Sequence, residues 1–168
     1  MGQPRERRYI AEYVAKTFPD SPVKLGCPLG PGVRGLVEEY GLPKALTMSR
    51  GFRPEVDAVV VLPEKLIVIE AKIFKIVDGI SKLPVYASLI PATPELWIHR
   101  KLPVEMRLIT PWLTAQVQEM ARGMGVEVDI YNPPWIKDYV DKMHSYWTAE
   151  AREARAAKLK LREILGVE

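Results

Sequence analysis

The stretch VDAVVVLPEKLIVIEAK, residues 56–72, decides the fold of this chain. It contains two runs rich in β-branched residues, joined only by Pro63-Glu64. These runs predict two strands in the middle of a covered sheet, where a charged side chain is costly unless it has a partner or a metal. The charged residues at one end of the pair, Asp57, Glu70 and Lys72, are therefore the candidates for chemistry.

The length of the hairpin loop decides whether these three side chains meet. Side chains alternate along a strand, so Glu70 and Lys72 share a face. A two-residue loop pairs Asp57 with Glu70, a four-residue loop pairs Asp57 with Lys72, and a three-residue loop turns Asp57 to the opposite face. Pro63 favours the four-residue loop, because two-residue turns want a positive φ that proline forbids. Either even loop gathers two carboxylates and one ammonium at one end of the sheet.

Asp57 followed by Glu70-Ala71-Lys72 resembles the motif of the PD-(D/E)XK phosphodiesterase superfamily, whose fold occurs in restriction enzymes, junction resolvases and RecB-type exonucleases. In that superfamily the two acidic residues hold Mg²⁺, the carbonyl between Glu and Lys adds a ligand, and the lysine helps to activate water. The resemblance implies these roles for Asp57, Glu70, Ala71 and Lys72. The chain departs from the motif at Val56, which stands where many members have proline.

Magnesium suits such a donor set, with Mn²⁺ as an alternative. Mg²⁺ prefers carboxylate and carbonyl oxygens and keeps several waters, which leaves room for a phosphodiester. A bound metal lowers the pKa of its water and neutralises charge in the transition state. The competing interpretation is an ordinary salt bridge at the rim of the sheet, since acidic residues and lysine often pair there.

A glutamate on the first helix is a further catalytic candidate. Residues 4–18 predict an amphipathic helix that ends at Pro19. Several members of the superfamily place a glutamate on the first helix that reaches the metal. Glu12 is the better match and Glu6 the second choice, although both could be exposed helix charges.

Basic and aromatic residues supply candidates for nucleic-acid contacts. Residues 1–53 hold nine basic and five acidic side chains, against a net charge of +3 for the whole chain, so a polyanion could be guided there. Lys82 and Tyr86 lie four apart on a predicted helix that starts at Ser81. Lys82 stands where RecB-type nucleases carry glutamine. The predicted contacts with DNA are Arg34, Arg50, Arg53, Lys82 and Tyr86.

The predicted fold class is α/β, with a restriction-endonuclease-like three-layer core of order α-β-β-β-α-β and an added α-β. The domain spans residues 1–133, and a long C-terminal helix from Pro134 to about Leu165 lies in residues 134–168. The predicted elements are a helix at 4–18, a helix at 33–40, strands at 45–52, 56–62 and 65–72, a helix at 81–90, a strand at 104–109, a helix at 111–123 and a strand at 126–131.

Composition favours one compact cytoplasmic domain. The single Cys27 excludes an internal disulfide, and no secretory or membrane-spanning segment is evident. One asparagine and three glutamines against 15 prolines suggest a thermophilic source.

Two functions follow from these features. The first is a Mg²⁺-dependent nuclease, an endonuclease of DNA repair, recombination or phage type. The second is a structural or assembly protein, for example of a virus particle, that would use the C-terminal helix to form a homo-oligomer or to bind a protein partner. The second function would place the protein in the virion.

Overall fold

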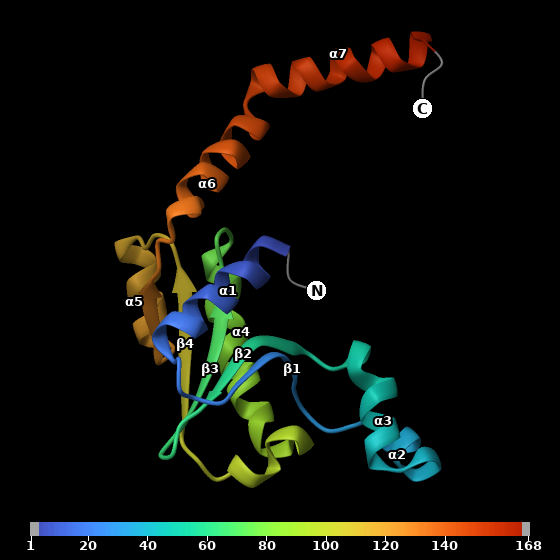
Figure 1. Ribbon diagram of the computed structural model, residues 1–168, viewed down its shortest axis with the longest axis vertical. Coiled ribbons are helices and arrows are strands. Elements are labelled where there is room, and N and C mark those ends of the chain that lie inside the picture. The colour runs from blue at the N-terminus through green and yellow to red at the C-terminus, as the bar shows by residue number, and fades with distance from the viewer. Residues whose placement is uncertain (1–3, 166–168) are drawn as a thin grey trace. The chain divides into compact units, whose positions relative to one another are not determined.

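The computed structural model describes residues 4–165 and divides the chain into two units, Met1–Tyr131 and Asn132–Glu168. A five-stranded sheet lies at the centre of the first unit (Figure 1). Its strands stand in chain order as β1 (Val23–Pro28), β2 (Glu55–Val61), β3 (Leu66–Ala71), β4 (Val104–Thr110) and β5 (Val126–Ile130).

The first three strands are antiparallel neighbours, whereas β3, β4 and β5 run parallel. Parallel neighbours need crossover connections, and α4 (Ile76–Leu89) and α5 (Ala115–Gly123) provide them. With α1 (Pro4–Thr17) in front, and apart from short helices between β1 and β2 and after α4, the elements follow the predicted α-β-β-β-α-β order of the restriction-endonuclease-like fold, and α5 and β5 add a further α-β. The predicted fold class is confirmed.

Helices α1 and α4 cover opposite faces of the sheet. Along β4, Leu108 belongs to the apolar cluster that α4 completes, while its neighbour Arg107 donates a hydrogen bond of 3.2 Å to the Tyr13 hydroxyl on α1. Successive residues of a strand point to opposite faces, so these two contacts place the helices on different sides. The chain thus forms three layers, as predicted.

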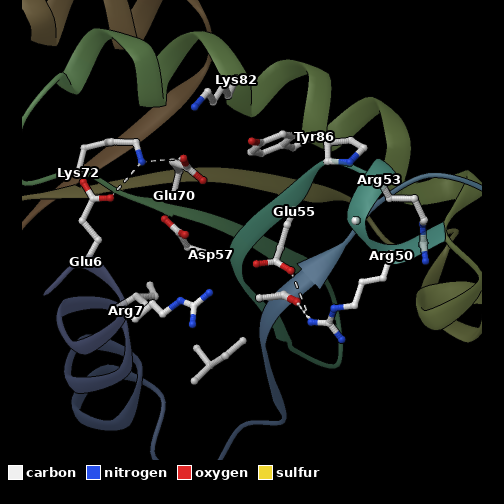
Figure 2. A pocket seen from close by; sticks show the side chains of 15 residues that line it. Glu6, Arg7, Arg50, Arg53, Glu55, Asp57, Glu70, Lys72, Lys82 and Tyr86 are labelled. Carbon is white, nitrogen blue, oxygen red and sulfur yellow. Dashed lines mark hydrogen bonds and ion pairs between the residues drawn. The ribbon is translucent and has the colours of Figure 1, made fainter. Parts of the chain in front are cut away.

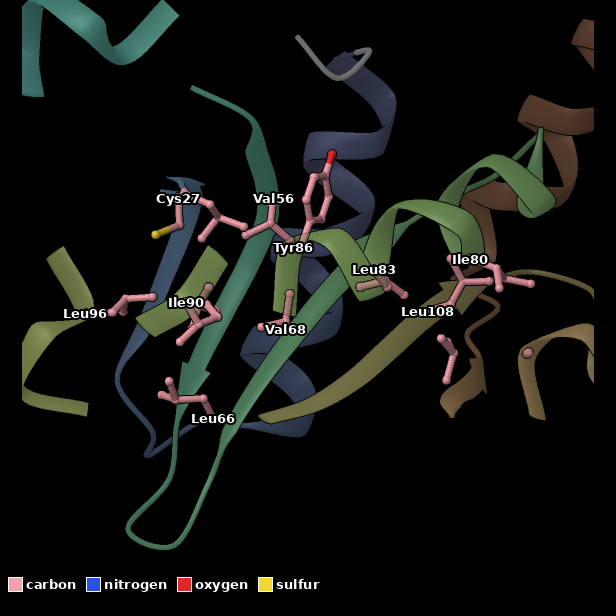
Figure 3. Packing of buried hydrophobic residues seen from close by; sticks show 14 of the residues in the cluster. Cys27, Val56, Leu66, Val68, Ile80, Leu83, Tyr86, Ile90, Leu96 and Leu108 are labelled. Carbon is pink, nitrogen blue, oxygen red and sulfur yellow. The ribbon is translucent and has the colours of Figure 1, made fainter. Parts of the chain in front are cut away.

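The core lies between α4 and the sheet (Figure 3). Ile80 and Leu83 of α4 are fully buried there against Leu66, Val68 and Leu108. Burying a side chain of this size contributes about 1.5–3 kcal/mol, so this cluster fixes where α4 crosses the sheet.

On the other face, α1 is held by aromatic and polar contacts. Tyr9 and Tyr13 are buried, and their rings lie 5.4 and 5.5 Å from the ring of Tyr131. The Tyr13 hydroxyl also donates a hydrogen bond to Asp129. Burial raises the pKa of Tyr13 to about 12, so the hydroxyl stays protonated and keeps donating. These contacts tie the start of the chain to the last strand.

The predicted strand at 45–52 is wrong, since these residues form α3 (Leu42–Ser49) and the 3₁₀-helix η1 (Arg50–Phe52). Pro43 at the start of α3 is the reason, because proline suits the first turn of a helix. The preceding helix at 33–40 was predicted correctly and is α2 (Arg34–Tyr40). The first strand is instead β1, whose residues the sequence analysis did not assign to a strand.

Helix α4 begins five residues before the predicted start at Ser81 and contains Pro84 in its interior. Proline there removes one backbone hydrogen bond. Tertiary packing outweighs this cost, because Ile76 and Ile80, which precede the proline, are buried. After α4 come two 3₁₀-helices, η2 (Ile90–Ala92) and η3 (Pro94–His99).

Two other helices differ from their predicted bounds. α5 starts at Ala115 rather than at Pro111, because the Thr114 hydroxyl caps it by accepting from the Val117 N–H at 3.3 Å. The single long helix predicted from Pro134 is two helices, α6 (Pro134–Trp147) and α7 (Ala149–Leu165). Thr148 breaks it with an extended backbone, and its hydroxyl donates to the Ser145 carbonyl at 2.9 Å. The assembly role of residues 134–168 stays a prediction.

Arg53 ties three loops of the first unit together. Its buried guanidinium donates to the carbonyls of Pro28, Leu29 and Gly30 at 3.0, 3.3 and 2.8 Å. It also forms two bonds with the Glu95 carboxylate, at 2.6 and 2.7 Å. Although burial raises the pKa of Glu95, the bonds from Arg53 hold it below its ordinary value. The end of β1 and η3 are therefore fixed to the start of β2.

We expect Arg53→Ala to lower the free energy of unfolding by about 4 kcal/mol, because it leaves a partly buried carboxylate and several carbonyls without their donor. Urea denaturation measures this. Arg34→Ala is the control, since Arg34 is 92% exposed and pairs only with Glu38 in the described part of the chain, and it should change stability by less than about 0.5 kcal/mol. Equal losses in both variants would contradict a structural role for Arg53.

Candidate active site

The register of the β2–β3 hairpin sets the geometry of the site. The ladder runs from Ala58↔Ile69 to Val61↔Leu66, and the Leu62 N–H donates to the Lys65 carbonyl at 2.9 Å. This is the register of a two-residue loop, so the preference for a four-residue loop was wrong. Pro63 is tolerated because neither Pro63 nor Glu64 has a positive φ, so this two-residue loop does not need the conformation that proline forbids. The next pair in this register places Asp57 opposite Glu70.

The structure brings Asp57, Glu70 and Lys72 together at one end of the sheet (Figure 2). Lys72 Nζ lies 3.0 Å from Glu70 Oε1. Asp57 Oδ2 accepts a hydrogen bond of 2.8 Å from the Ala71 backbone N–H. That bond fixes the aspartate against the neighbouring strand and leaves its second oxygen, Oδ1, for another partner.

These residues lie in a cleft of about 960 Å³. Its walls come from α1, the end of β1, the η1 turn, β2, β3 and α4. The lining residues are Glu6, Arg7, Ile10, Leu25, Gly26, Arg50, Gly51, Arg53, Pro54, Glu55, Asp57, Glu70, Lys72, Lys82 and Tyr86. The cleft therefore has acidic groups at its centre and cationic groups around them.

Burial and mutual repulsion make the carboxylates hard to ionise. Burial, with the charge of Asp57, raises the pKa of Glu70 to about 7, although Lys72 opposes the rise. Burial also raises the pKa of Asp57, against the bond from Ala71 and the charge of Lys72. For Lys72, burial lowers the pKa, but the charges of Glu70 and Glu6 raise it by more. The pKa therefore lies above its ordinary value, and the ammonium stays charged. The site thus has more negative potential than one lysine neutralises.

One carboxylate oxygen of Glu70 is not satisfied by any described group of the protein. Its Oε2 atom is buried and has no hydrogen-bond partner in the described part of the chain. A buried unpaired oxygen costs about 1–3 kcal/mol, and more if charged, so a structure keeps one only where something else uses it. Mg²⁺ prefers carboxylate oxygens, so this oxygen and the second oxygen of Asp57 are the groups of the protein that could hold it.

Protein groups alone would not complete such a metal site. Within residues 4–165, no three His, Cys, Asp or Glu side chains are grouped closely enough to hold a metal. Two carboxylates and a carbonyl leave coordination positions open for water and substrate, as Mg²⁺ sites that act on phosphates commonly do.

Gly79 of α4 lets the helix approach this site. A Cβ atom at this position would lie 2.7 Å from Lys72 Cγ, 2.7 Å from Leu108 Cδ1 and 3.5 Å from Glu70 Cγ. The first two distances are below any normal contact between carbon atoms. Glycine in a helix interior costs stability, and here the close packing against Lys72 requires it.

The structure does not bring Glu12 to the site. Glu12 pairs with Arg8 at 2.7 Å and does not line the cleft, so its position gives no support to the predicted catalytic role. Glu6 lies there instead, with Oε2 3.7 Å from Lys72 Nζ. The two glutamates are six residues apart, which is roughly 9 Å along a helix axis, and only the N-terminal end of α1 reaches the cleft.

Among the predicted nucleic-acid contacts, Arg50, Lys82 and Tyr86 line the cleft and Arg34 does not. Arg53 also lines it, but its guanidinium is buried in bonds to the protein, which gives no support to its predicted contact with DNA. Tyr86 is only 9% exposed, and burial together with the charges of Glu70 and Asp57 raises its pKa to about 12.

Three residues of the site were not predicted from the sequence: Arg7, Glu55 and Gly79. Arg7 and Glu55 line the cleft, and Gly79 packs against Lys72 and Glu70. Nothing in the local sequence distinguishes Arg7 and Gly79, because each reaches the site through an element distant in the chain from Asp57 and Glu70. Only Glu55, two residues before Asp57 on β2, could have been inferred from strand alternation.

Comparisons with known proteins add the following findings. Neither protein-family models nor curated proteins gave a match. Among solved structures, a repair endonuclease from Pyrococcus abyssi is similar at 17% identity and a TM-score of 0.46, over 80% of this chain and 49% of the other. An EndoMS complex with double-stranded DNA is similar at 15% identity and a TM-score of 0.44, over 80% of this chain and 47% of the other. This chain spans about half the length of those chains.

No helix within residues 4–165 is long and apolar enough to span a membrane.

We expect Gly79→Ala to lower the free energy of unfolding by about 1–3 kcal/mol, because the added methyl group overpacks the contact between α4 and Lys72. Thermal or urea denaturation measures the loss. Gly35→Ala is the matched control, since nothing lies within 4 Å of a Cβ at Gly35 in α2. That variant should gain about 0.5–1 kcal/mol from helix propensity. A neutral Gly79→Ala would show that the helix can move away without cost.

The raised pKa of Glu70 predicts a pH-dependent stability. Between its ordinary value of 4.5 and about 7, the folded chain keeps a proton that the unfolded chain has released. Stability without metal should therefore fall as pH rises through this window, by about 3 kcal/mol in total, and stay level above it.

Glu70→Gln cannot ionise, so its stability relative to the wild type should increase between pH 4.5 and 7. Urea titrations with chelator at several pH values measure this difference. Glu12→Gln, on the exposed side of α1, is the control and should show no such trend. A difference for Glu70→Gln that stays constant with pH would refute the raised pKa.

Proposed function

We propose that this chain is a metal-dependent nuclease that hydrolyses phosphodiester bonds of DNA. One observation carries the proposal: the buried Glu70 Oε2 has no hydrogen-bond partner in the described part of the chain, beside Asp57 and the charged Lys72 in an open cleft. A salt bridge at a sheet rim would not need a second buried carboxylate. The retained acidic pair and lysine favour an enzyme over an assembly protein.

Asp57, Glu70 and the Ala71 carbonyl would hold Mg²⁺ or Mn²⁺. The metal, when bound, would supply a water of lowered pKa and neutralise charge on the phosphate. Glu70 would lose its proton on metal binding, because a cation at Oε2 reverses the effect of burial on its pKa. Asp57 is held by Ala71, so its free oxygen needs no rearrangement to become a ligand.

Lys72 would act on the phosphate or on the attacking water. Its side chain is 12% exposed, so water screens its charge little. Glu70 and Glu6 hold the ammonium from the side of the carboxylates. Gly79 allows α4 to pack against its stem, which limits where the ammonium can move. Such preorganised charge is a large part of catalysis in phosphoryl transfer.

The cations around the carboxylates suit a polyanionic substrate. Lys82 is 42% exposed and pairs with Asp78 at 2.9 Å, and Arg50 is 59% exposed at the opposite wall. Arg7 completes the group from α1. Each can reach a phosphate at little cost, because exposed ion pairs are weak. The acidic centre alone would repel DNA, so these side chains supply the attraction.

We expect Glu70→Gln and Lys72→Ala to reduce cleavage of DNA by about 100-fold or more, since each removes a preorganised charge at the scissile phosphate. Plasmid, linear and branched DNA, each with Mg²⁺ or Mn²⁺, are the substrates, and gel analysis is the measurement. Glu12→Gln is the control and should stay within about twofold of the wild type.

Calorimetry with Mn²⁺ distinguishes the residues that bind the metal from a residue that acts only on the substrate. Wild type should bind, and Asp57→Asn and Glu70→Gln should lose binding, while Lys72→Ala should retain it. No cleavage of any substrate by the wild type, or variants that cleave as well as the wild type, would refute the nuclease function.

A further inference from the structure

Phe52 is the most exposed aromatic side chain among those whose exposure is described, at 85%. Burying a phenylalanine stabilises a fold by about 1.5–3 kcal/mol. Because Phe52 is almost fully exposed, its side chain contributes little of this free energy. An exposed large aromatic ring with no role in the core is a candidate for a binding contact.

The position of Phe52 in the chain places it at the rim of the cleft. Arg50, Gly51, Arg53 and Pro54 all line the cleft, and Phe52 lies between them without lining it. Neighbouring Cα atoms are only about 3.8 Å apart, so the backbone of Phe52 must stand beside the cleft wall. Its ring extends from there into solvent.

The turn that carries Phe52 is anchored on both sides. Arg50 donates to the Gly26 carbonyl at 3.0 Å and lies 3.4 Å from Glu55 Oε2. Arg53 is held by Pro28, Leu29, Gly30 and Glu95, and its N–H donates to the Arg50 carbonyl at 3.3 Å. A ring on a fixed turn loses little entropy when it binds, which is what a preorganised contact requires.

Charge indicates which kind of partner the ring meets. The exposed charged groups beside it at the cleft are Arg50 on the same turn, paired with Glu55, and the cationic Lys82 and Arg7, so cations outnumber the one exposed carboxylate. Cations that track a phosphate backbone, next to an aromatic ring, form the usual arrangement for single-stranded nucleic acids. The exposed Met48 and Leu42 on the adjoining α3 would suit a protein partner instead, and the oligomeric state of the Phe52 variant tests that alternative.

We propose that Phe52 stacks on an unpaired base of the strand whose phosphodiester lies at Asp57 and Glu70. This inference rests on the proposed nuclease function and names its substrate class, a nucleic acid with single-stranded or extrahelical bases beside the cleaved bond. In a duplex the base faces are covered by their neighbours, so a side chain can stack on one only where the strand is unpaired.

Binding measured without divalent metal tests the proposal. Fluorescence anisotropy would compare a labelled single-stranded oligonucleotide with its duplex for wild type, Phe52→Ala, Phe52→Leu and Phe52→Trp. Phe52→Ala should weaken binding of the single strand about tenfold, the usual size for one stacked base, and leave the duplex unchanged. Phe52→Trp should restore it and Phe52→Leu should not. Tyr40→Ala, another exposed aromatic residue but away from the cleft, is the control.

The outcomes separate this inference from the nuclease function. Equal binding by wild type and Phe52→Ala, with cleavage intact, would overturn the stacking role alone. If Phe52→Leu bound the single strand as tightly as the wild type, the ring would make an ordinary apolar contact instead of stacking, and the inference would also be overturned. A change of oligomeric state in Phe52→Ala, seen by light scattering without DNA, would assign the ring to self-association. A wild type that neither binds nor cleaves DNA would overturn both proposals.

Discussion

The register between β2 and β3 is the constraint on which the site depends. Because Val61 pairs with Leu66, the alternation of side chains brings Asp57 and Glu70 opposite each other, on the face that α4 covers. A slip of one residue would turn Asp57 to the other face and place apolar side chains in solvent. The same burial that fixes the register therefore forces two carboxylates together, and their raised pKa values record the energetic cost.

Helix α4 forms one wall of the cleft that contains these two carboxylates. Ile80 and Leu83 dock it on the sheet, and Gly79, on the turn before them, lets its backbone approach Lys72. Lys82 and Tyr86 then face the cleft because they lie three and seven residues after Gly79, on one side of the helix. The lysine that neutralises Glu70 and the residues that would meet a substrate are thus positioned by the same apolar packing.

Two arginines three residues apart illustrate how burial separates structural from functional charge. Arg53 is buried, satisfies three carbonyls and pairs with Glu95, so nothing of its guanidinium remains for a ligand. Arg50 is exposed and only loosely bound at the cleft wall. The first arginine fixes the turn, and the fixed turn presents the second together with Phe52. A charged residue at a cleft is therefore a candidate for binding only if its donors are free to leave their partners.

The sequence by itself determined the strands 56–62 and 65–72 and the meeting of Asp57, Glu70 and Lys72, because strand alternation and an even loop act locally. Tertiary structure decided what depends on contacts between distant segments. It held Pro84 inside α4, placed Glu6 rather than Glu12 beside Lys72, and buried Arg53 while leaving Arg50 exposed. The residues 45–52 became a helix and a turn rather than a strand, since β1 already occupies the edge of β2. Local patterns fix which face a side chain takes, but only the packing of the whole domain decides what lies opposite that face.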